Sequence, residues 1–267
     1  MAEALNPSFV FDEDTGTQSL GAGRFRARID PRWNIGNAPN GGYLVTVALD
    51  AIGRTLPHPD PFSVTAHFPS RTEPGEVEVQ VETVRTGRAH STSEARLVQR
   101  GEARVLVVAT YGDLERIEGP TTILEPAPEF PPPQDCVRAE GPIAPEFVKQ
   151  FDLRLTPETA MWATTRPSGI AEMCGWVRFV DDREPDTRSL SLFADSFPPT
   201  IFNLGPAVWV PTLELTVHVR ARPSPGWLQC RFQTRYLIKG YLEEDGEIWD
   251  STGQLVALSR QLARVHT

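Results

Sequence analysis

The chain contains an internal repeat, and this repeat limits the possible folds more than any other feature of the sequence. Residues after position 60 recur 151 positions later, with His67 matching His218, Arg71 matching Arg222, and Pro74-Gly75 matching Pro225-Gly226. In both copies, alternating polar and apolar residues run into a Pro-Gly turn and then into a second alternating stretch. Alternation with a period of two is the pattern of a half-buried strand. Two copies of one such unit predict two similar halves that pack together in one chain.

A length of 267 residues suits two units of about 130 residues each, enough for each to bury a core. The net charge of −9 and the pI near 5.1 argue against nucleic-acid binding, which needs a basic surface. No signal-peptide pattern opens the chain, and apolar runs such as Val105–Ala109 are too short to span a bilayer. The three cysteines are widely spaced, as in a reducing compartment. We therefore expect a cytoplasmic protein with no nucleic-acid partner and no membrane insertion.

The first copy is predicted to surround a buried helix with strands. Asn37–Tyr43 is rich in residues that form turns and start helices, and the segment after it is almost entirely apolar, which favours a helix over Gly42–Arg54 that is buried on most sides. A strand is possible at Ser8–Phe11. The other expected strands are Gly23–Ile29, Phe62–Ser70, Glu76–Arg88, Ser91–Gln99 and Ala103–Asp113.

A proline-rich stretch separates the two copies. Residues 118–145 contain eight prolines, a density that excludes helix and central strand. We expect an extended linker over the surface, assigned to 118–150, between an N-terminal unit at 1–117 and a C-terminal unit at 151–267.

The second copy repeats the order of the first. The segment from Leu190 to Leu204 stands where the first copy has its buried helix. The expected strands are Met173–Phe179, Thr212–Arg220, Trp227–Ile238, Glu243–Asp250 and Leu255–Val265. The pattern predicts an α+β fold in which each antiparallel sheet curls around one central helix, with the two sheets side by side.

Five short motifs follow one another along the two copies. They are Gly41-Gly42-Tyr43-Leu44, Phe62–Phe68 with Pro74-Gly75, Ala194-Asp195, Thr212-Leu213-Glu214, and the last strand from Gly253 to Gln261. In this order and spacing they resemble the acyl-CoA thioesterase II family, over roughly 20–115 and 165–265. The resemblance implies a double hot-dog fold of two tandem units. It also implies hydrolysis of acyl-CoA without a cofactor, and assembly into a homodimer or higher homo-oligomer.

The resemblance implies a catalytic site of Asp195, Thr212 and Gln261. These residue types suit the reaction, because thioester hydrolysis needs a water that is held and deprotonated beside the carbonyl. A carboxylate can accept the proton of the water, while a hydroxyl and an amide can orient the water without competing as bases. Asn40, Gly41, Gly42 and Tyr43 are expected to bind substrate, since N–H groups at a helix start favour a developing oxyanion and glycine allows close approach.

The two copies differ at the catalytic positions. Thr212 corresponds to Pro61 with the offset of 151, and Gln261 corresponds to Ala109 with the offset of 152 that aligns the last strands. The helix start of the first copy contains asparagines but no carboxylate. These differences predict one working water site, in the second unit, to which the first unit contributes a helix dipole and a binding surface.

Structural roles remain open for each of these residues. Asp195 suits a helix cap or turn, Thr212 suits any strand and has a rival in Thr216, and Gln261 suits a solvent-facing position. His67 and His218 recur in both copies, which favours a packing role. Glu214 is interpreted as a salt-bridge partner rather than a base.

Other enzyme classes lack their sequence signatures here. There is no Gly-x-Ser-x-Gly elbow, no phosphate loop and no dinucleotide fingerprint, and the five histidines have no metal-ligand spacing, so no metal is expected. Two alternatives to a thioesterase remain. One is a non-catalytic acyl-CoA or lipid-binding protein of the same fold. The other is an enoyl-CoA hydratase, whose Asp-x-Asn-Pro-x-His type of loop is missing.

Overall fold

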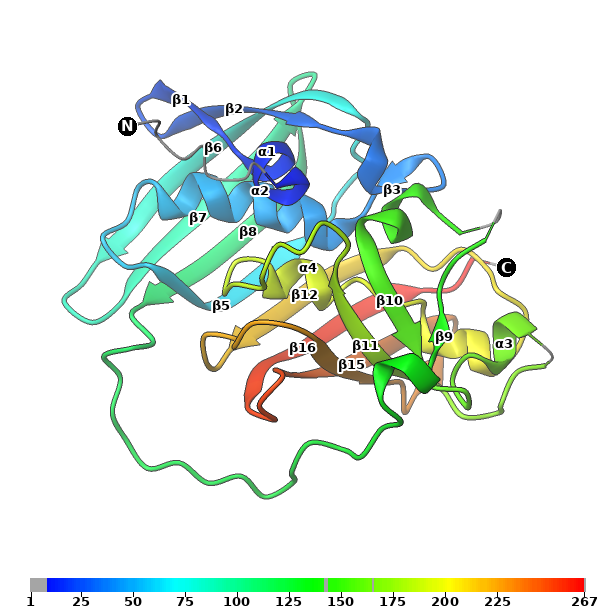
Figure 1. The fold of residues 1–267 in the computed structure, drawn as a ribbon. Coiled ribbons are helices and arrows are strands. Elements are labelled where there is room, and N and C mark those ends of the chain that lie inside the picture. Colours follow the sequence, from blue (N-terminus) through cyan, green and yellow to red (C-terminus); the bar gives the residue numbers. More distant parts are fainter. Residues whose placement is uncertain (1–8, 142–143, 165, 267) are drawn as a thin grey trace, which may run out of the picture.

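One antiparallel sheet of 14 strands runs through both halves of the chain in the computed structural model, which describes residues 9–141, 144–164 and 166–266 (Figure 1). The first half contributes the order β1-β2-β6-β7-β8-β5, and the second half continues it as β12-β16-β15-β13-β11-β10-β9. A short strand, β14, pairs with β15 at one side of this path. The expected side-by-side arrangement of two antiparallel sheets is therefore confirmed.

The strands of the first half are β1 Gln18–Gly21, β2 Arg24–Ile29, β3 Asn34–Ile35, β4 Ala38–Pro39, β5 Asp60–His67, β6 Gly75–Thr86, β7 Ser91–Gln99 and β8 Glu102–Gly112. Those of the second half are β9 Val137–Arg138, β10 Phe151–Leu155, β11 Glu172–Phe179, β12 Thr212–Val219, β13 Leu228–Gln233, β14 Leu237–Ile238, β15 Tyr241–Trp249 and β16 Leu255–Arg264. The helices are α1 Val10–Thr15, α2 Gly41–Gly53, α3 Met161–Thr164 and α4 Leu190–Phe193, with short 3-10 turns η1 Pro31–Trp33, η2 Pro133–Asp135, η3 Glu146–Gln150 and η4 Thr200–Asn203.

The two halves meet at β5 and β12, where the repeat pairs with itself. Thr65 lies opposite Thr216, and their hydroxyl oxygens are 2.9 Å apart, at a sequence separation of 151. Because this separation equals the repeat offset, the two threonines are copies of each other. Exchanging the halves maps the pairing of β5 with β12 onto itself, so an approximate two-fold axis passes through this pair.

Helix α2 crosses the inner face of the first half of the sheet (Figure 1). Asn40 caps it, with its side-chain oxygen accepting a hydrogen bond from the N–H of Tyr43 at 2.8 Å. Its apolar residues, among them Val45, Val47 and Ile52, are completely buried. The predicted helix Gly42–Arg54 is thus confirmed to within one residue at each end.

The second half lacks the long helix that the repeat predicts. Only the single turn α4 forms, and η4 follows it after a short break. Pro198 and Pro199 stand in this break, and proline removes the backbone donor that a continuous helix needs. The segment remains buried, with Leu190, Leu192 and Phe193 in the core, so it fills the place of the helix without its length.

The N-terminal segment differs from the expected strand at Ser8–Phe11. Ser8 lies outside the described residues, and Val10–Thr15 forms helix α1 instead. Phe11 of this helix is almost fully buried and packs on Phe179 of the second half, with ring centroids 5.1 Å apart. Packing against the other half of the chain therefore decides the local structure here.

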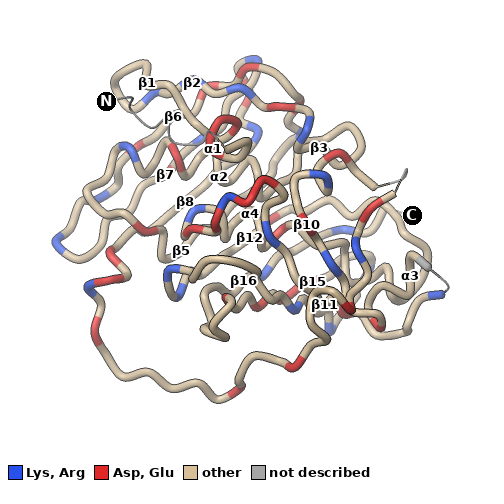
Figure 2. Tube along the Cα trace, in the orientation of Figure 1, with Lys and Arg blue, Asp and Glu red and all other residues tan. Residues whose placement is uncertain are grey.

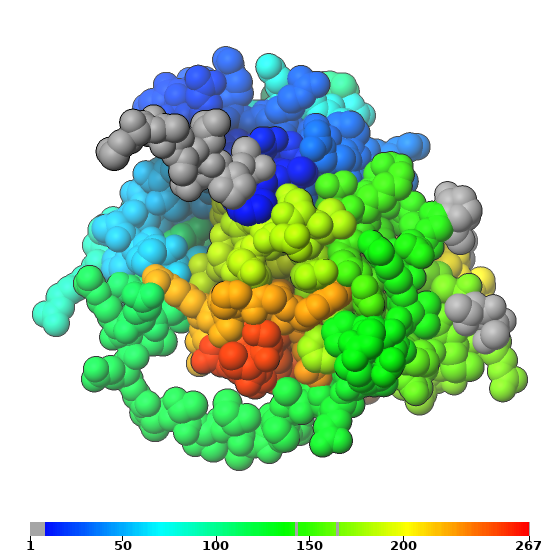
Figure 3. All heavy atoms as spheres, in the orientation of Figure 1, coloured from blue at the N-terminus to red at the C-terminus, as the bar shows by residue number. Residues whose placement is uncertain are grey.

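The proline-rich segment is extended, as its composition predicts, but most of it stands away from the body of the protein (Figures 1 and 3). Its later part returns to the surface, where the Pro131 carbonyl accepts a hydrogen bond from the Trp176 indole at 2.9 Å. The stretch assigned to the linker also supplies β9, which pairs with β10 at the edge of the sheet. Strand β10, at Phe151–Leu155, is absent from the strands that the sequence predicts.

Charged residues connect the two halves beside α1 and α4, where acidic and basic positions lie close together along the backbone trace (Figure 2). Arg188 bridges two carboxylates of the first half, at 2.8 Å from Asp50 and 3.0 Å from Asp12. Arg183 binds the same Asp12 at 2.9 Å and Asp186 at 2.6 Å.

Among the described residues, no helix is both long and apolar enough to cross a lipid bilayer.

Candidate active site

A cavity of about 670 Å³ lies between the N-terminus of α2, the segment after α4 and the start of β12. Asp195, Thr212 and Gln261 all line it, and so do Asn40 and Gly41. The fold therefore brings the three expected catalytic residues to one cavity from three separate elements. Most of the remaining wall is apolar and includes Leu44, Phe68, Phe147, Trp162, Phe197, Phe202, Val208, Trp209 and Val210.

Asp195 reaches across the duplication to the helix of the other half. It follows the C-terminal end of α4 by two residues, rather than opening a helix as the sequence suggests. One carboxylate oxygen, Oδ2, accepts hydrogen bonds from the backbone N–H of Gly42 at 2.8 Å and from the side-chain amide of Asn40 at 2.9 Å. The same amide also donates to the backbone carbonyl of Asp195 at 2.8 Å. The second half supplies the carboxylate, and the first half holds it.

The two glycines at the start of α2 allow this close approach. A Cβ atom on Gly42 would lie 2.7 Å from the Ser191 carbonyl oxygen and 2.9 Å from the Cβ of Asp195. A Cβ atom on Gly41 would lie 3.1 Å from the Asp195 carboxylate. Glycine is therefore required at position 42 because α2 and α4 pack with their backbones almost in contact.

Burial raises the pKa of Asp195 to about 6, and the hydrogen bonds from Gly42, Asn40 and Gly41 oppose this rise. A carboxylate in an apolar cavity loses the hydration that stabilises its charge. The N-terminus of α2 replaces part of that hydration through its N–H groups and its dipole. Asp195 is consequently a stronger base than an exposed carboxylate, yet it is ionised near neutral pH.

Thr212 and Gln261 form a second polar group in the cavity lining. Thr212 is the first residue of β12, and its hydroxyl donates to the Gln261 side-chain oxygen at 3.2 Å. Gln261 on β16 is 9% exposed, so its amide is a cavity-lining group rather than a solvent-facing one. In the described part of the chain, neither side chain hydrogen-bonds directly to Asp195.

Glu244 also lines the cavity, and it is not among the residues that the sequence singles out. It lies on β15 directly opposite Gln261 and accepts a hydrogen bond from the Gln261 side-chain nitrogen at 3.3 Å. Burial, together with the nearby charge of Asp195, raises the pKa of Glu244 to about 7. The sequence does contain a signal that could have identified Glu244. Glu244 alternates in phase with Leu242 and Ile248, on the face of the strand that is buried, and a carboxylate is unusual on such a face.

Several expected roles do not fit the geometry. Tyr43, expected to bind substrate, is fully buried and stacks on Trp33 with ring centroids 5.1 Å apart, and it does not line the cavity. The N–H of Gly42, expected as an oxyanion donor, is occupied by Asp195. Thr216, the rival of Thr212, donates to Glu214 at 2.6 Å beside the two-fold axis, away from the cavity lining.

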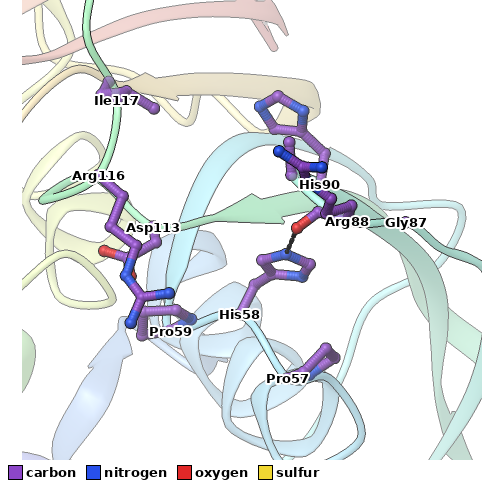
Figure 4. Close-up of a pocket in the computed structure, with 10 residues that line it drawn as sticks. Pro57, His58, Pro59, Gly87, Arg88, His90, Asp113, Arg116 and Ile117 are labelled. Carbon is purple, nitrogen blue, oxygen red and sulfur yellow. Dashed lines mark hydrogen bonds and ion pairs between the residues drawn. The ribbon is translucent and has the colours of Figure 1, made fainter.

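A second hollow, of about 590 Å³, lies in the first half around His58, Arg88 and His90 (Figure 4). The His58 ring is held between the Ser91 hydroxyl at 2.9 Å and the Arg88 carbonyl at 3.3 Å. Its one carboxylate, Asp113, is paired with Arg116 at 3.0 Å. Among its described lining residues, this hollow does not combine a buried carboxylate with a hydroxyl and an amide, as the main cavity does with Asp195, Thr212 and Gln261.

Comparison with known proteins connects both halves to one family. Residues 29–112 match the family model of the acyl-CoA thioesterase N-terminal domain, and residues 124–265 match that of the C-terminal domain. A Thermobifida fusca protein assigned to thioesterase II has a solved structure with 31% identity, a TM-score of 0.90 and coverage of 98% of this chain and 99% of its own. A hot dog fold protein of Alicyclobacillus acidocaldarius is 23% identical, with a TM-score of 0.88 and coverage of 98% and 99%. The thioesterase-like protein TwmA of Talaromyces wortmannii is 25% identical over 328 residues, covering 98% of this chain and 94% of its own.

These matches agree with the architecture. The N-terminal family domain falls on the half of the sheet around α2, and the C-terminal one falls on the half that carries Asp195, Thr212 and Gln261. The C-terminal match alone spans more than half of the 267 residues. The chain belongs to the acyl-CoA thioesterase family and has its double hot-dog fold.

Proposed function

We propose that this protein hydrolyses an acyl-CoA thioester to a free acid and CoA. The observation that carries the proposal is the position of Asp195, a carboxylate of raised pKa that the N-terminus of α2 holds at a cavity shared with Thr212 and Gln261. A basic carboxylate facing a hydroxyl and an amide is an arrangement that can hold one water molecule and remove its proton.

In the proposed reaction, a water lies between Asp195 and the Thr212–Gln261 pair. Its oxygen attacks the thioester carbonyl carbon while one of its protons passes to Asp195. The tetrahedral intermediate then collapses, the carbon–sulfur bond breaks, and the CoA thiolate leaves and takes up the proton from Asp195. The positive end of the α2 dipole favours the negative charge that develops on the carbonyl oxygen.

The apolar wall of the cavity suits an acyl chain. Phe68, Phe197 and Trp209 surround the polar groups, and burying an aliphatic chain against such side chains favours binding by about 0.8 kcal/mol per methylene. We also propose that the protein acts as a homodimer or higher homo-oligomer, as the family resemblance implies, and that it is cytoplasmic, as its few and widely spaced cysteines indicate. Light scattering distinguishes such an assembly from a monomer of 29.6 kDa.

The direct test is a hydrolysis panel with acyl-CoA esters of increasing chain length, measured by release of the CoA thiol. Turnover that depends on chain length supports the proposal. Binding of the same esters without thiol release would instead support the non-catalytic acyl-CoA-binding alternative. Hydration of an enoyl-CoA, monitored as a decrease in its ultraviolet absorbance, would support a hydratase.

A further inference from the structure

Glu244 is a buried carboxylate for which the proposed reaction has no use so far. It is 5% exposed, and no Lys or Arg in the described part of the chain pairs with it. One oxygen, Oε2, accepts the backbone N–H of Thr200 at 2.9 Å, and the other, Oε1, accepts the side-chain N–H of Gln261 at 3.3 Å. A buried carboxylate without a cation destabilises the fold, so its presence calls for an explanation.

The Gln261 amide has an oxygen end and a nitrogen end, and its partners decide which way it faces. An ionised carboxylate only accepts hydrogen bonds, so Glu244 requires the nitrogen end. The oxygen end must then face Thr212, whose hydroxyl has to donate its only proton to Gln261. The lone pairs of the Thr212 hydroxyl remain free to accept a proton from another group in the cavity.

We propose that Glu244 is a positioning residue, which fixes the Gln261 amide so that the Thr212 hydroxyl accepts a hydrogen bond from the attacking water. This inference rests on the proposed thioester hydrolysis. A water that donates one hydrogen to Thr212 and the other to Asp195 keeps a lone pair for the carbonyl carbon. In the reverse polarity, Thr212 would donate to one of the two lone pairs of the water oxygen, which makes that oxygen less nucleophilic and leaves the second hydrogen of the water without this acceptor.

The repeat supports a role in the reaction. Glu244 corresponds to Ser93 with the offset of 151, and both lie opposite their counterparts on the last strand of the unit, Gln261 and Ala109. Ser93 is fully buried and donates to Thr83 at 3.4 Å. The fold therefore tolerates a small hydroxyl at this position, and the carboxylate occurs only in the copy that has Thr212 and Gln261.

The test is the near-isosteric variant Glu244→Gln, assayed above pH 8 so that wild-type Glu244 is ionised. The carbonyl oxygen of the introduced glutamine must still accept the N–H of Thr200, so its NH₂ end faces Gln261. Gln261 then turns its oxygen toward position 244 and its nitrogen toward Thr212, which reverses the hydrogen-bond polarity at the water. We expect kcat to fall about 10- to 100-fold, the effect of one lost hydrogen bond at a reacting group, with KM unchanged.

The matched control is Glu243→Gln on the same strand. Glu243 accepts backbone N–H groups of Arg235 and Tyr236 at 3.3 and 3.1 Å, which a glutamine oxygen can also do, and it does not line the cavity. This variant should retain wild-type kcat and KM. Thermal melting of both variants checks that they fold.

A second variant exchanges the two residues, Glu244→Gln with Gln261→Glu. The NH₂ of the glutamine now at position 244 then donates to the carboxylate now at position 261, whose other oxygen accepts the Thr212 hydroxyl, so the original polarity at the water returns. The exchanged variant should be more active than Glu244→Gln alone. A Glu244→Gln variant with wild-type kcat, or an exchanged variant no more active than Glu244→Gln, would overturn the inference.

One measurement separates this inference from the proposed function. The side-chain amide resonances of Gln261 can be identified by their loss in Gln261→Glu, and they report the turn of the amide without any turnover. They should shift in Glu244→Gln and stay unchanged in Glu243→Gln. If the wild-type protein hydrolyses no acyl-CoA, the proposed function fails, whereas unchanged resonances in Glu244→Gln contradict the positioning role itself.

Discussion

The Asp195 carboxylate lies 2.8 Å from the backbone nitrogen of Gly42, and these two residues come from opposite halves of a duplicated chain. Neither half contains a complete site, because one half supplies the base and the other supplies the helix N-terminus that holds it. In the first half, the repeat matches Thr212, Glu244 and Gln261 with Pro61, Ser93 and Ala109. The duplication therefore yields one candidate site in place of two.

Replacing Asp195 by Asn should abolish most of the activity. The amide keeps the shape and can still accept the N–H of Gly42, but it cannot take up the proton of the water. General-base catalysis contributes about 10²–10⁴-fold, so kcat should fall by that factor while acyl-CoA binding persists. Steady-state kinetics and a binding isotherm on the same preparation test this. An Asp195→Asn variant with full activity would exclude the proposed base.

Replacing Gln261 by Ala should reduce kcat less than Asp195→Asn does. The change removes an orienting hydrogen bond to Thr212 but leaves the base and the helix dipole in place. Parallel measurement of both variants gives the order. If Gln261→Ala proves the more damaging variant at equal thermal stability, orientation of the water outweighs its deprotonation, and the proposed division of roles is wrong.

The rate should rise with pH between about 6 and about 7. Asp195, with a pKa of about 6, accepts a proton only when ionised, and Glu244, with a pKa of about 7, orients Gln261 only when ionised. The two carboxylates interact, so the observed pKa values belong to the pair. A profile of kcat/KM against pH checks this, and activity that increases as the pH falls below 6 would contradict it.

Much of the fold follows from local patterns, and the exceptions have identifiable causes. Alternation locates Ser91–Gln99 at its observed bounds, and the apolar run after the Gly-Gly pair locates α2 within one residue. The expected helix of the second half is too long because apolar content at Leu190–Leu204 resembles a buried helix, while prolines interrupt it. Strand β10 escapes prediction because its short segment, Phe151–Leu155, follows the proline-rich stretch closely.

The candidate site is predictable only where residues occur in recognisable motifs. Asp195, Thr212 and Gln261 follow from the order of the motifs, and the repeat marks two of them as asymmetric. Glu244 belongs to no such motif, and its importance depends on a cross-strand partner that only the pairing of β15 with β16 reveals. Tyr43 does not line the cavity, because adjacent helical residues face different directions and a motif does not bring all its members to one place.

Replacing Gly42 by Ala should destabilise the protein and impair the site. The new Cβ would lie 2.7 Å from the Ser191 carbonyl oxygen and 3.0 Å from the Leu192 Cα, both backbone atoms, so α2 must move away from Asp195. Overpacking of this kind typically lowers the free energy of unfolding by about 1–3 kcal/mol. Gly53→Ala in the same helix is the control, because its Cβ would lie 3.8 Å from the Tyr111 ring, an ordinary contact. Urea unfolding should separate the two variants, and equal midpoints would contradict the close packing.

The raised pKa of Asp195 also predicts how stability changes with pH. In the unfolded chain its pKa is near 3.8, and in the folded protein it is about 6, so between these values the folded state holds the proton more tightly. The contribution of this group is therefore fully present below pH 4 and is lost as the pH rises through 6. A shift of this size corresponds to an effect on the order of 1–3 kcal/mol.

Asp195→Asn does not titrate, so its free energy of unfolding relative to wild type should increase between about pH 4.5 and about pH 7.5. Glu244 titrates in both proteins with the same sign and largely cancels in this comparison. Urea denaturation of both proteins at the two pH values checks the prediction, and a relative stability that stays constant would show that the fold does not penalise the Asp195 charge.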